Sequence, residues 1–310
     1  MNPFDLFPEP PPTPDRLHFS RLRLMARSPA HYKAAARTET RAMRGGVALH
    51  VLALGGELIV YPDRRTGLAW DGFRRVMGGA EPYIYDGPRT GKAWAAAKEE
   101  AGRMPILTSV ELPAAFAARE VQARRRAEGQ YPAAVVTPTE YDAARRVADA
   151  VLGHSGARDL IEHAQRETYR EWSYLGRDCA GTLDIRGADY LAELKQTRCS
   201  EPSRFARDAI WRAYHAQLAW YLHAIDDAPW TPDVFVIAVE SEAPHVVTVF
   251  EVPSETLLAG EQMVRGWMER LAVCEASNEW PGYVQSTVPL RIESDFELVG
   301  FDEEEADDAA

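Results

Sequence analysis

Two carboxylates and one lysine are the residues of this sequence whose types and spacing best suit chemistry. Asp184 is followed, after eight intervening residues, by Glu193, Leu194 and Lys195. The segments 180–186 and 190–196 both have the apolar or alternating character of strands. Glu193 and Lys195 are two residues apart, so on a strand their side chains point to the same face. If the two strands are neighbours, two carboxylates and one ammonium converge at one end of a sheet.

This set of groups suits phosphodiester hydrolysis. Asp184 and Glu193 can hold a hard divalent cation, and the Leu194 carbonyl can supply a third oxygen ligand. Such a cation polarises the scissile phosphate and lowers the pKa of a bound water. Lys195 can orient that water or neutralise charge that develops on the phosphate. The bare pattern is weak, because solvated faces of surface strands often carry Glu and Lys two residues apart.

Two further stretches carry polar groups among apolar ones. Gln217 and Tyr221 are spaced i, i+4, so they share one face of an expected helix; the alternative is a half-buried helix whose aromatic residues pack. His50 stands in an apolar helical stretch, where it is either a satisfied core residue or a ligand. Gly46, one turn earlier, predicts that another element approaches the histidine closely.

The periodicity along the chain predicts helices that alternate with strands, and hence an α/β fold with a mixed β-sheet core flanked by helices. Ser20, Ser28 and Thr139 are the expected helix N-caps. The expected helices are 21–27, 28–37, 43–54, 137–152, 157–164, 202–225 and 254–276. The expected strands are 57–61, 167–174, 180–186, 190–196, 234–240 and 245–251, the last two forming a hairpin.

The bulk composition indicates a globular protein. The chain has 310 residues, of which 46% are hydrophobic, enough for a substantial core. No apolar run is long enough to span a bilayer, so we expect no membrane association and a cytoplasmic location. The three cysteines are far apart, which excludes a disulfide framework or a four-cysteine metal cluster. We expect a disordered proline-rich leader (1–17), a single domain (18–296) and an acidic tail (297–310).

The net charge of −12 argues against a nucleic-acid partner, although the tail supplies six of the negative charges. A local basic groove can coexist with a negative total. Arg44, Arg65 and Arg89 stand near expected turns and can contact phosphate. Arg65 and Arg89 each begin a short repeat, Arg-Thr-Gly-x-Ala-Trp. The alternative to a phosphate contact is that the two copies are strand–turn–helix units that are similar by chance. Trp211 and Trp220 are expected in the core rather than as base-stacking platforms.

Taken in order, these motifs resemble the PD-(D/E)XK nuclease superfamily, and within it the exodeoxyribonuclease VIII (RecE) type found in phage recombination systems. The resemblance covers about residues 18–292. It comprises Ser20-Arg21-Leu22 with Ser28-Pro29-Ala30-His31-Tyr32, Gly46-x-x-x-His50, Glu167 before Trp172, Gly181…Asp184, Glu193-Leu194-Lys195, Tyr214-His215-x-Gln217-x-x-x-Tyr221 and Trp280-Pro281-Gly282-Tyr283. Thr182 and Leu183 depart from the Arg and Pro of many relatives, and Gln196 separates Lys195 from Thr197.

The resemblance implies a restriction-endonuclease-like fold and a role for each matching residue. Asp184 and Glu193 would bind Mg²⁺, for which Mn²⁺ could substitute, and Lys195 would be the catalytic lysine. Gln217 and Tyr221 would position the site or the DNA. His50 would be a metal ligand or a phosphate contact, and Glu167 would assist a second metal.

The activity implied is exonuclease digestion of linear double-stranded DNA from its ends, 5′ to 3′, for phage-type homologous recombination. A ring-shaped homo-oligomer and a single-strand annealing recombinase are the implied partners. Two alternatives remain open. One is a repair or defence nuclease of the same superfamily with endonuclease or single-strand activity. The other is a DNA-binding module that has lost its chemistry.

Overall fold

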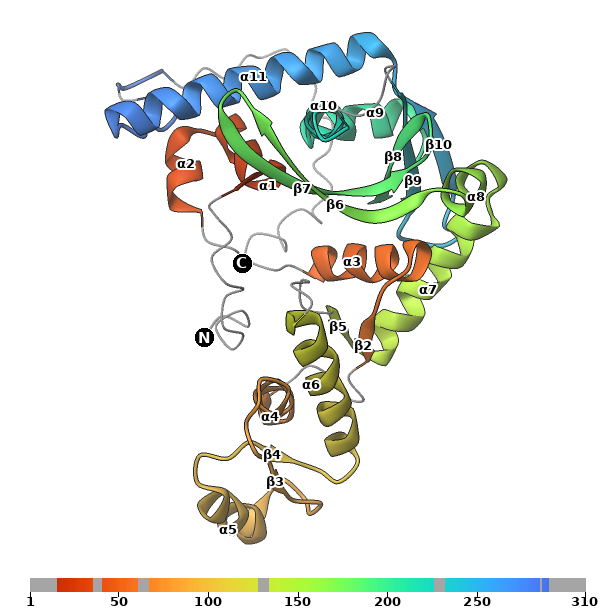
Figure 1. Cartoon of the computed structure of the whole chain (residues 1–310). Helices are drawn as coiled ribbons and strands as arrows, with labels where there is room; N and C mark the ends of the chain where they lie inside the picture. Colours follow the sequence, from red (N-terminus) through yellow and green to blue (C-terminus); the bar gives the residue numbers. More distant parts are fainter. Residues whose placement is uncertain are drawn as a thin grey trace.

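A six-stranded mixed β-sheet forms the centre of the molecule (Figure 1). The computed structural model describes residues 16–35, 41–60, 67–127, 134–225, 232–284 and 286–289. The leader expected at 1–17 lies almost wholly outside these residues, and the acidic tail lies entirely outside them. The strands of the sheet are β1 (Leu17–His18), β6 (Gln165–Tyr174), β7 (Arg177–Arg186), β8 (Tyr190–Thr197), β9 (Asp233–Glu240) and β10 (Val247–Glu251).

Strand β7 has three partners, and their registers leave an opening in the sheet. Along one edge, β6 runs antiparallel to β7 over nearly its whole length. Along the other edge, β1 pairs only with residues 179–180 and β8 only with residues 185–186. Residues 181–184 of β7 therefore face a gap between β1 and β8. Beyond it, β8 pairs in parallel with β9, and β9 forms the expected hairpin with β10.

Helices cover both faces of the sheet, as the sequence predicts (Figure 1). One face packs against a layer that contains α1 (Phe19–Leu22), the 3₁₀ helix η2 (Arg23–Ala26), α9 (Pro202–Trp211), α10 (Tyr214–Leu222) and α11 (Ser254–Ser277). The other face packs against α3 (Arg41–Leu54), α7 (Pro138–Gly153) and α8 (Ser155–Glu162). Helix α2 (Pro29–Ala34) lies beside η2 and α11. This arrangement gives the sheet two apolar cores, one on each face.

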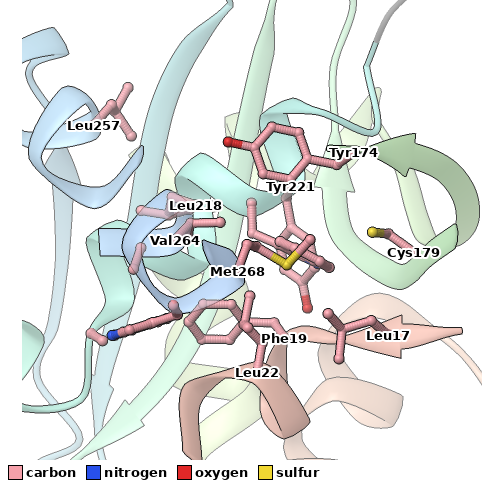
Figure 2. Packing of buried hydrophobic residues seen from close by; sticks show 14 of the residues in the cluster. Leu17, Phe19, Leu22, Tyr174, Cys179, Leu218, Tyr221, Leu257, Val264 and Met268 are labelled. Atoms are coloured by element: carbon pink, nitrogen blue, oxygen red, sulfur yellow. The ribbon is translucent and has the colours of Figure 1, made fainter. Parts of the chain in front are cut away.

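The larger core joins the start of the described chain to its last long helix. Phe19 and Leu22 of α1 lie against Val264 and Met268 of α11, as Figure 2 shows. A tight contact fixes α11 on α10, because a Cβ at Gly260 would stand 2.2 Å from the His215 carbonyl oxygen. Only glycine allows the two helices to approach this closely. The close contact between α10 and α11 thus depends on the absence of a side chain at Gly260.

A smaller lobe extends away from the sheet, beyond α3 and α7 (Figure 1). It contains α4 (Gly67–Met77), β3 (Tyr83–Ile84), α5 (Gly91–Ala101), β4 (Ile106–Leu107) and α6 (Glu111–Ala127) around its own apolar cluster. Strands β2 (Leu58–Val60) and β5 (Ala134–Val136) pair in parallel where the chain enters and leaves the lobe. Both copies of the short repeat begin a helix at their glycine, Gly67 for α4 and Gly91 for α5.

Three local predictions were wrong. Ser20 lies inside α1, whose N-cap is His18. Helix α7 is capped by Thr137, not Thr139, through a capping box with Glu140. The single helix expected over 202–225 is two helices, because Ala213 adopts a left-handed conformation with φ 56° and ψ 41°. Ser28 does cap α2, where its side chain accepts the His31 N–H.

Candidate metal centre and catalytic site

Asp184 lies where strands β7 and β8 separate. The antiparallel ladder between them includes Ile185 and Ala192 but does not continue to Asp184 and Glu193, the next opposed pair. Instead the Asp184 side chain enters the opening, and its Oδ2 accepts the Leu194 N–H at 2.9 Å. The other neighbour of Asp184 is also irregular, because Glu167 on β6 has φ 49°. Regular strand pairing is thus interrupted on both sides of Asp184, and its carboxylate lies in the opening between β7 and β8.

His50 on α3 closes this opening from the helix side. Its Nε2 lies 3.0 Å from the Leu194 carbonyl oxygen, and its Nδ1 lies 3.0 Å from Glu167 Oε1 and 3.6 Å from Asp184 Oδ1. Ligand atoms of His50, Glu167 and Asp184 lie within 4.8 Å of one another. The expected close approach at Gly46 is absent, since a Cβ there would meet nothing within 4 Å.

Glu193 and Lys195 point to the same face of β8, as their spacing predicts. Lys195 Nζ lies 2.6 Å from Glu193 Oε2, and the same oxygen accepts a 3.2 Å bond from Gln217 Nε2 on α10. Gln217 also donates to the Tyr221 hydroxyl at 3.2 Å. The ammonium of Lys195 stands 5.2 Å above the Tyr214 ring. Helix α10 therefore contacts the face of β8 that carries Glu193 and Lys195.

Burial and crowding of charge perturb the ionisable groups of the site. Burial favours the neutral imidazole, but the carboxylates of Asp184 and Glu167 outweigh it and raise the pKa of His50 to about 9. Burial and the charge of Asp184 raise the pKa of Glu193, although Lys195 opposes them. Burial disfavours the ammonium of Lys195, yet Glu193 and Asp184 raise its pKa. The carboxylates of the site thus favour the protonated, positively charged forms of His50 and Lys195.

The donor set fits a divalent cation. Three carboxylates and the Leu194 carbonyl offer hard oxygen ligands, and one imidazole nitrogen joins them. Among the residues that the structure describes, Glu193 Oε1 is buried without a hydrogen-bond partner, which is costly unless a cation or water meets it. The structure thus brings together four members of the predicted metal set, His50, Glu167, Asp184 and Leu194. Glu193 stands beside them, engaged by Lys195 and Gln217.

Comparison with known proteins agrees with this geometry. Residues 120–288, more than half of the chain, match a family model described as a PDDEXK-like domain of unknown function. The chain belongs to this family. A solved structure, a "putative exonuclease" from Eubacterium rectale, matches with a TM-score of 0.51 and 9% identity, covering 88% of this chain and 91% of that one. At this identity the likeness concerns the fold alone. No curated protein matches the chain.

The family match includes every acidic and basic residue of the site except His50. Glu167, Asp184, Glu193, Lys195, Gln217 and Tyr221 all lie within it. His50, on α3, lies outside the matched region. Most of the lobe also lies outside it. The mixed sheet, its two helical layers and the family match confirm the predicted fold class. The PDDEXK-like domain therefore has the fold of a nuclease.

A pocket of about 320 Å³ adjoins the candidate site. It is lined by residues of β1, α1 and β7, and by Gln217 and Tyr221, which it shares with the candidate site. Its remaining lining residues are His18, Phe19, Ser20, Arg23, Ala180, Gly181 and Thr182. A Cβ at Gly181 would stand 2.7 Å from the Tyr221 ring, so glycine is needed for this aromatic to sit against β7. Sequence analysis missed the pocket, because a two-residue parallel strand such as β1 leaves no detectable pattern.

Of the three arginines predicted to bind DNA, the structure describes the side chain of Arg89 alone. Arg89 pairs with Glu111 in the lobe, where Nη2 lies 3.0 Å from Oε2. Arg65 lies outside the described residues, and only the backbone of Arg44, within α3, is described. Their phosphate contacts remain predictions. The tryptophan prediction was half wrong, since Trp220 is fully buried but Trp211 is 89% exposed. None of the described helices is long and apolar enough to cross a membrane.

Proposed function

We propose that this PDDEXK-like domain is a Mg²⁺-dependent exodeoxyribonuclease that hydrolyses linear double-stranded DNA from its ends. The observation that carries the proposal is the convergence of Asp184, Glu167, His50 and the Leu194 carbonyl beside the Glu193–Lys195 pair. A nuclease fold supports phosphodiester hydrolysis as the reaction, and the oxygen-rich donor set supports Mg²⁺, with Mn²⁺ as a substitute.

Each residue of the site has a distinct task in this proposal. Asp184, Glu167, His50 and Leu194 would hold the cation, which when bound supplies charge to polarise the phosphate and acidify water. Glu193 would complete the acidic set and anchor Lys195. Lys195 would stabilise negative charge on the phosphate or orient the attacking water. Gln217 would fix Glu193, and Tyr221 would fix Gln217, so that the carboxylate and ammonium are preorganised.

We propose 5′ to 3′ digestion, with a single-strand annealing recombinase and further copies of this chain as partners. Support comes from the ordered motifs that resemble exodeoxyribonuclease VIII. The exonuclease description of the structural neighbour points the same way for the class of activity.

Digestion of end-labelled DNA tests the proposal. Linear duplex, labelled at either the 5′ or the 3′ end, and closed-circular duplex are incubated with Mg²⁺, with Mn²⁺ and with a chelator. We expect loss of the 5′ label first from linear DNA, an intact circle, and no reaction with the chelator or with Lys195→Ala. Arg146→Ala, at an exposed position on α7, is the matched control and should react like the parent.

Other outcomes have definite meanings. Equal cutting of the circle would replace the exonuclease with an endonuclease of the same superfamily. Early loss of the 3′ label would reverse the polarity. No hydrolysis with either cation would favour a DNA-binding module without chemistry. Light scattering of the purified chain tests the oligomer, since a monomer at assay concentrations would contradict it.

A further inference from the structure

Trp211 at the end of α9 is exposed in a way that core packing does not explain. Its side chain is 89% exposed, and its neighbour Ile210 is 68% exposed. The left-handed turn at Ala213 follows immediately and separates this end of α9 from α10. Large exposed aromatic surface is unfavourable in water and marks an interaction site when polar or charged residues surround it. The question is therefore which partner covers the indole.

Helix α9 has two different faces. Phe205 is buried and stacks on Phe250, with ring centroids 4.7 Å apart, and also contacts Tyr214 at 6.1 Å. Tyr214 in turn lies below Lys195 Nζ. On the solvent side, Arg204, Arg207 and Trp211 are spaced i, i+3 and i+7, so they form one exposed stripe. The inner face thus anchors the helix to the catalytic strand while the outer face presents two guanidinium groups and an indole.

The C-terminal end of α9 contacts a residue that lines the pocket. Arg23 lines the pocket and donates from Nη1 to the Arg212 carbonyl oxygen at 3.2 Å. The same pocket includes Gln217, which bonds to Glu193. Contacts therefore link Glu193, through Gln217 and the pocket, to Arg23 and then to Arg212, the residue next to Trp211. A DNA strand that follows these contacts from the pocket reaches the Trp211 end of the stripe.

The charge of α9 points to a polyanion. Positions 202–212 contain three arginines and one aspartate, in a chain whose net charge is −12. Within the part of the chain that the structure describes, neither Arg204 nor Arg207 forms an ion pair. Glu201 is already engaged as the N-cap of α9, where it accepts the Ser203 and Arg204 N–H groups. Arginines beside an exposed aromatic side chain are the combination that binds single-stranded nucleic acid, by phosphate contacts and base stacking.

We propose that the stripe formed by Arg204, Arg207 and Trp211 binds an unpaired stretch of the DNA substrate, with one base stacked on Trp211. The arginines neutralise the backbone, and the strand continues past Arg23 into the pocket beside Gln217. This inference rests on the proposed nuclease function, because it assumes that DNA is the polyanion. It adds a site for single-stranded DNA beyond the metal centre.

Binding of tailed and blunt duplexes tests the proposal. All variants carry Lys195→Ala so that the DNA stays intact, and fluorescence anisotropy measures the affinity for duplexes with or without a short single-stranded tail. We expect Trp211→Ala to weaken binding of the tailed duplex about tenfold, the loss of one stacked base, and to change blunt-duplex binding much less. Trp211→Phe should retain most of the affinity, because a phenyl ring also stacks. Leu258→Ala, at a 63% exposed position on α11, should match the parent.

A second readout reports on stacking itself. A fluorescent base analogue in the tail should be quenched by the parent and by Trp211→Phe, but not by Trp211→Ala. Unchanged affinity and quenching in Trp211→Ala would overturn the proposal. Equal losses in the Phe and Ala variants would also overturn it, because stacking would not be the cause. A smaller particle in Trp211→Ala by light scattering, with unchanged DNA binding, would show instead that the stripe joins copies of this chain.

The same DNA given to the chain with an intact Lys195 separates this proposal from the proposed function. Hydrolysis together with binding that ignores Trp211 would overturn the stripe alone. Binding that depends on Trp211, without hydrolysis under any cation, would overturn the nuclease function alone.

Discussion

Two buried glutamates, one in the sheet and one in the lobe, have the same type of partner but very different surroundings. Glu193 is 1% exposed and pairs with Lys195, and Glu111 is 5% exposed and pairs with Arg89. Glu111 begins α6, where its Oε2 also accepts the Thr108 N–H and its own N–H bonds to Thr108 Oγ1. Glu193 instead has one oxygen bonded to Lys195 and Gln217 and the other without a partner.

In the proposed function, this difference distinguishes a structural carboxylate, Glu111, from one that takes part in the reaction, Glu193. Glu111 and Thr108 form a capping box at the start of α6. Arg89 balances the charge of Glu111 within the lobe. Glu193 lies beside Asp184, and Asp184 and Glu167 both lie against His50, so three carboxylates outnumber the two cationic groups, Lys195 and His50. An unbalanced buried charge costs stability unless another ion arrives. The excess of acidic groups, rather than burial or pairing, therefore marks the site.

The largest effect that tests this comparison is the loss of hydrolysis in Glu193→Gln. Removing the charge weakens the hold on both the cation and Lys195, so we expect the rate to fall about 10³-fold, or ~4 kcal/mol in transition-state stabilisation. Stability should not fall, since repulsion with Asp184 is relieved. Initial rates on linear DNA and thermal unfolding measure the two quantities. A rate within about tenfold of the parent would show that Glu193 is structural after all.

The second-largest expected effect is the change in stability on metal removal, which should depend on the sheet site and not on the lobe. We expect Mg²⁺ at about a hundredfold excess over its dissociation constant to stabilise the metal-free protein by ~2.7 kcal/mol. Asp184→Asn should abolish this increment, while Glu111→Gln should retain it, because Glu111 is already paired with Arg89 whereas Asp184 lies in the carboxylate cluster of the sheet. Thermal unfolding with chelator and then with Mg²⁺ is the measurement. Equal stabilisation of the parent and Asp184→Asn would place the cation elsewhere.

The lobe should show the opposite dependence. Glu111→Ala removes the bonds to Arg89 and to the Thr108 N–H, and we expect it to lower the free energy of unfolding by about 2 kcal/mol. The Arg89 side chain is 29% exposed, so solvent screening limits the ionic part of this loss. Activity per folded molecule should stay near that of the parent. Urea unfolding tests this, with Glu81→Ala, from a largely exposed pair with Arg119, as the control. A collapse of activity in the folded variant would instead link the lobe to catalysis.

Local patterns in the sequence predicted the sheet region well because its strands are long and strongly patterned. The segments around Asp184 and Glu193 form adjacent strands as expected, and the two-residue spacing placed Glu193 and Lys195 together. Thr137 and Glu140 have the residue types and spacing of a capping box, although Thr139 was predicted as the cap. In contrast, the left-handed Ala213 divides the segment 202–225, which was predicted as one helix, into α9 and α10. Alanine favours helices, so the residue type does not indicate this break.

Other parts of the site depend on contacts that no local spacing encodes. His50 meets Glu167 across 117 positions, so its role came from family resemblance rather than from geometry. The φ of 49° at Glu167, between the paired residues Arg166 and Thr168 of β6, is likewise not indicated by residue type. Trp211 was expected in the core because its apolar character suggests burial. Hydrophobicity alone does not distinguish a core residue from one that binds a partner.

Two glycines offer the smallest and most selective test of the comparison. A Cβ at Gly181 would meet the Tyr221 ring at 2.7 Å, and a Cβ at Gly72 in the lobe would meet the Ile106 carbonyl oxygen at 2.9 Å. Each alanine variant should therefore lose about 1 kcal/mol of stability through overpacking. Only Gly181→Ala should also slow hydrolysis, by about tenfold or ~1.4 kcal/mol, because Tyr221 must shift and Gln217 then loses its support. Rates and urea unfolding of both variants measure this split. Since the two substitutions add the same methyl group, equal rates would mean that Tyr221 does not position the site.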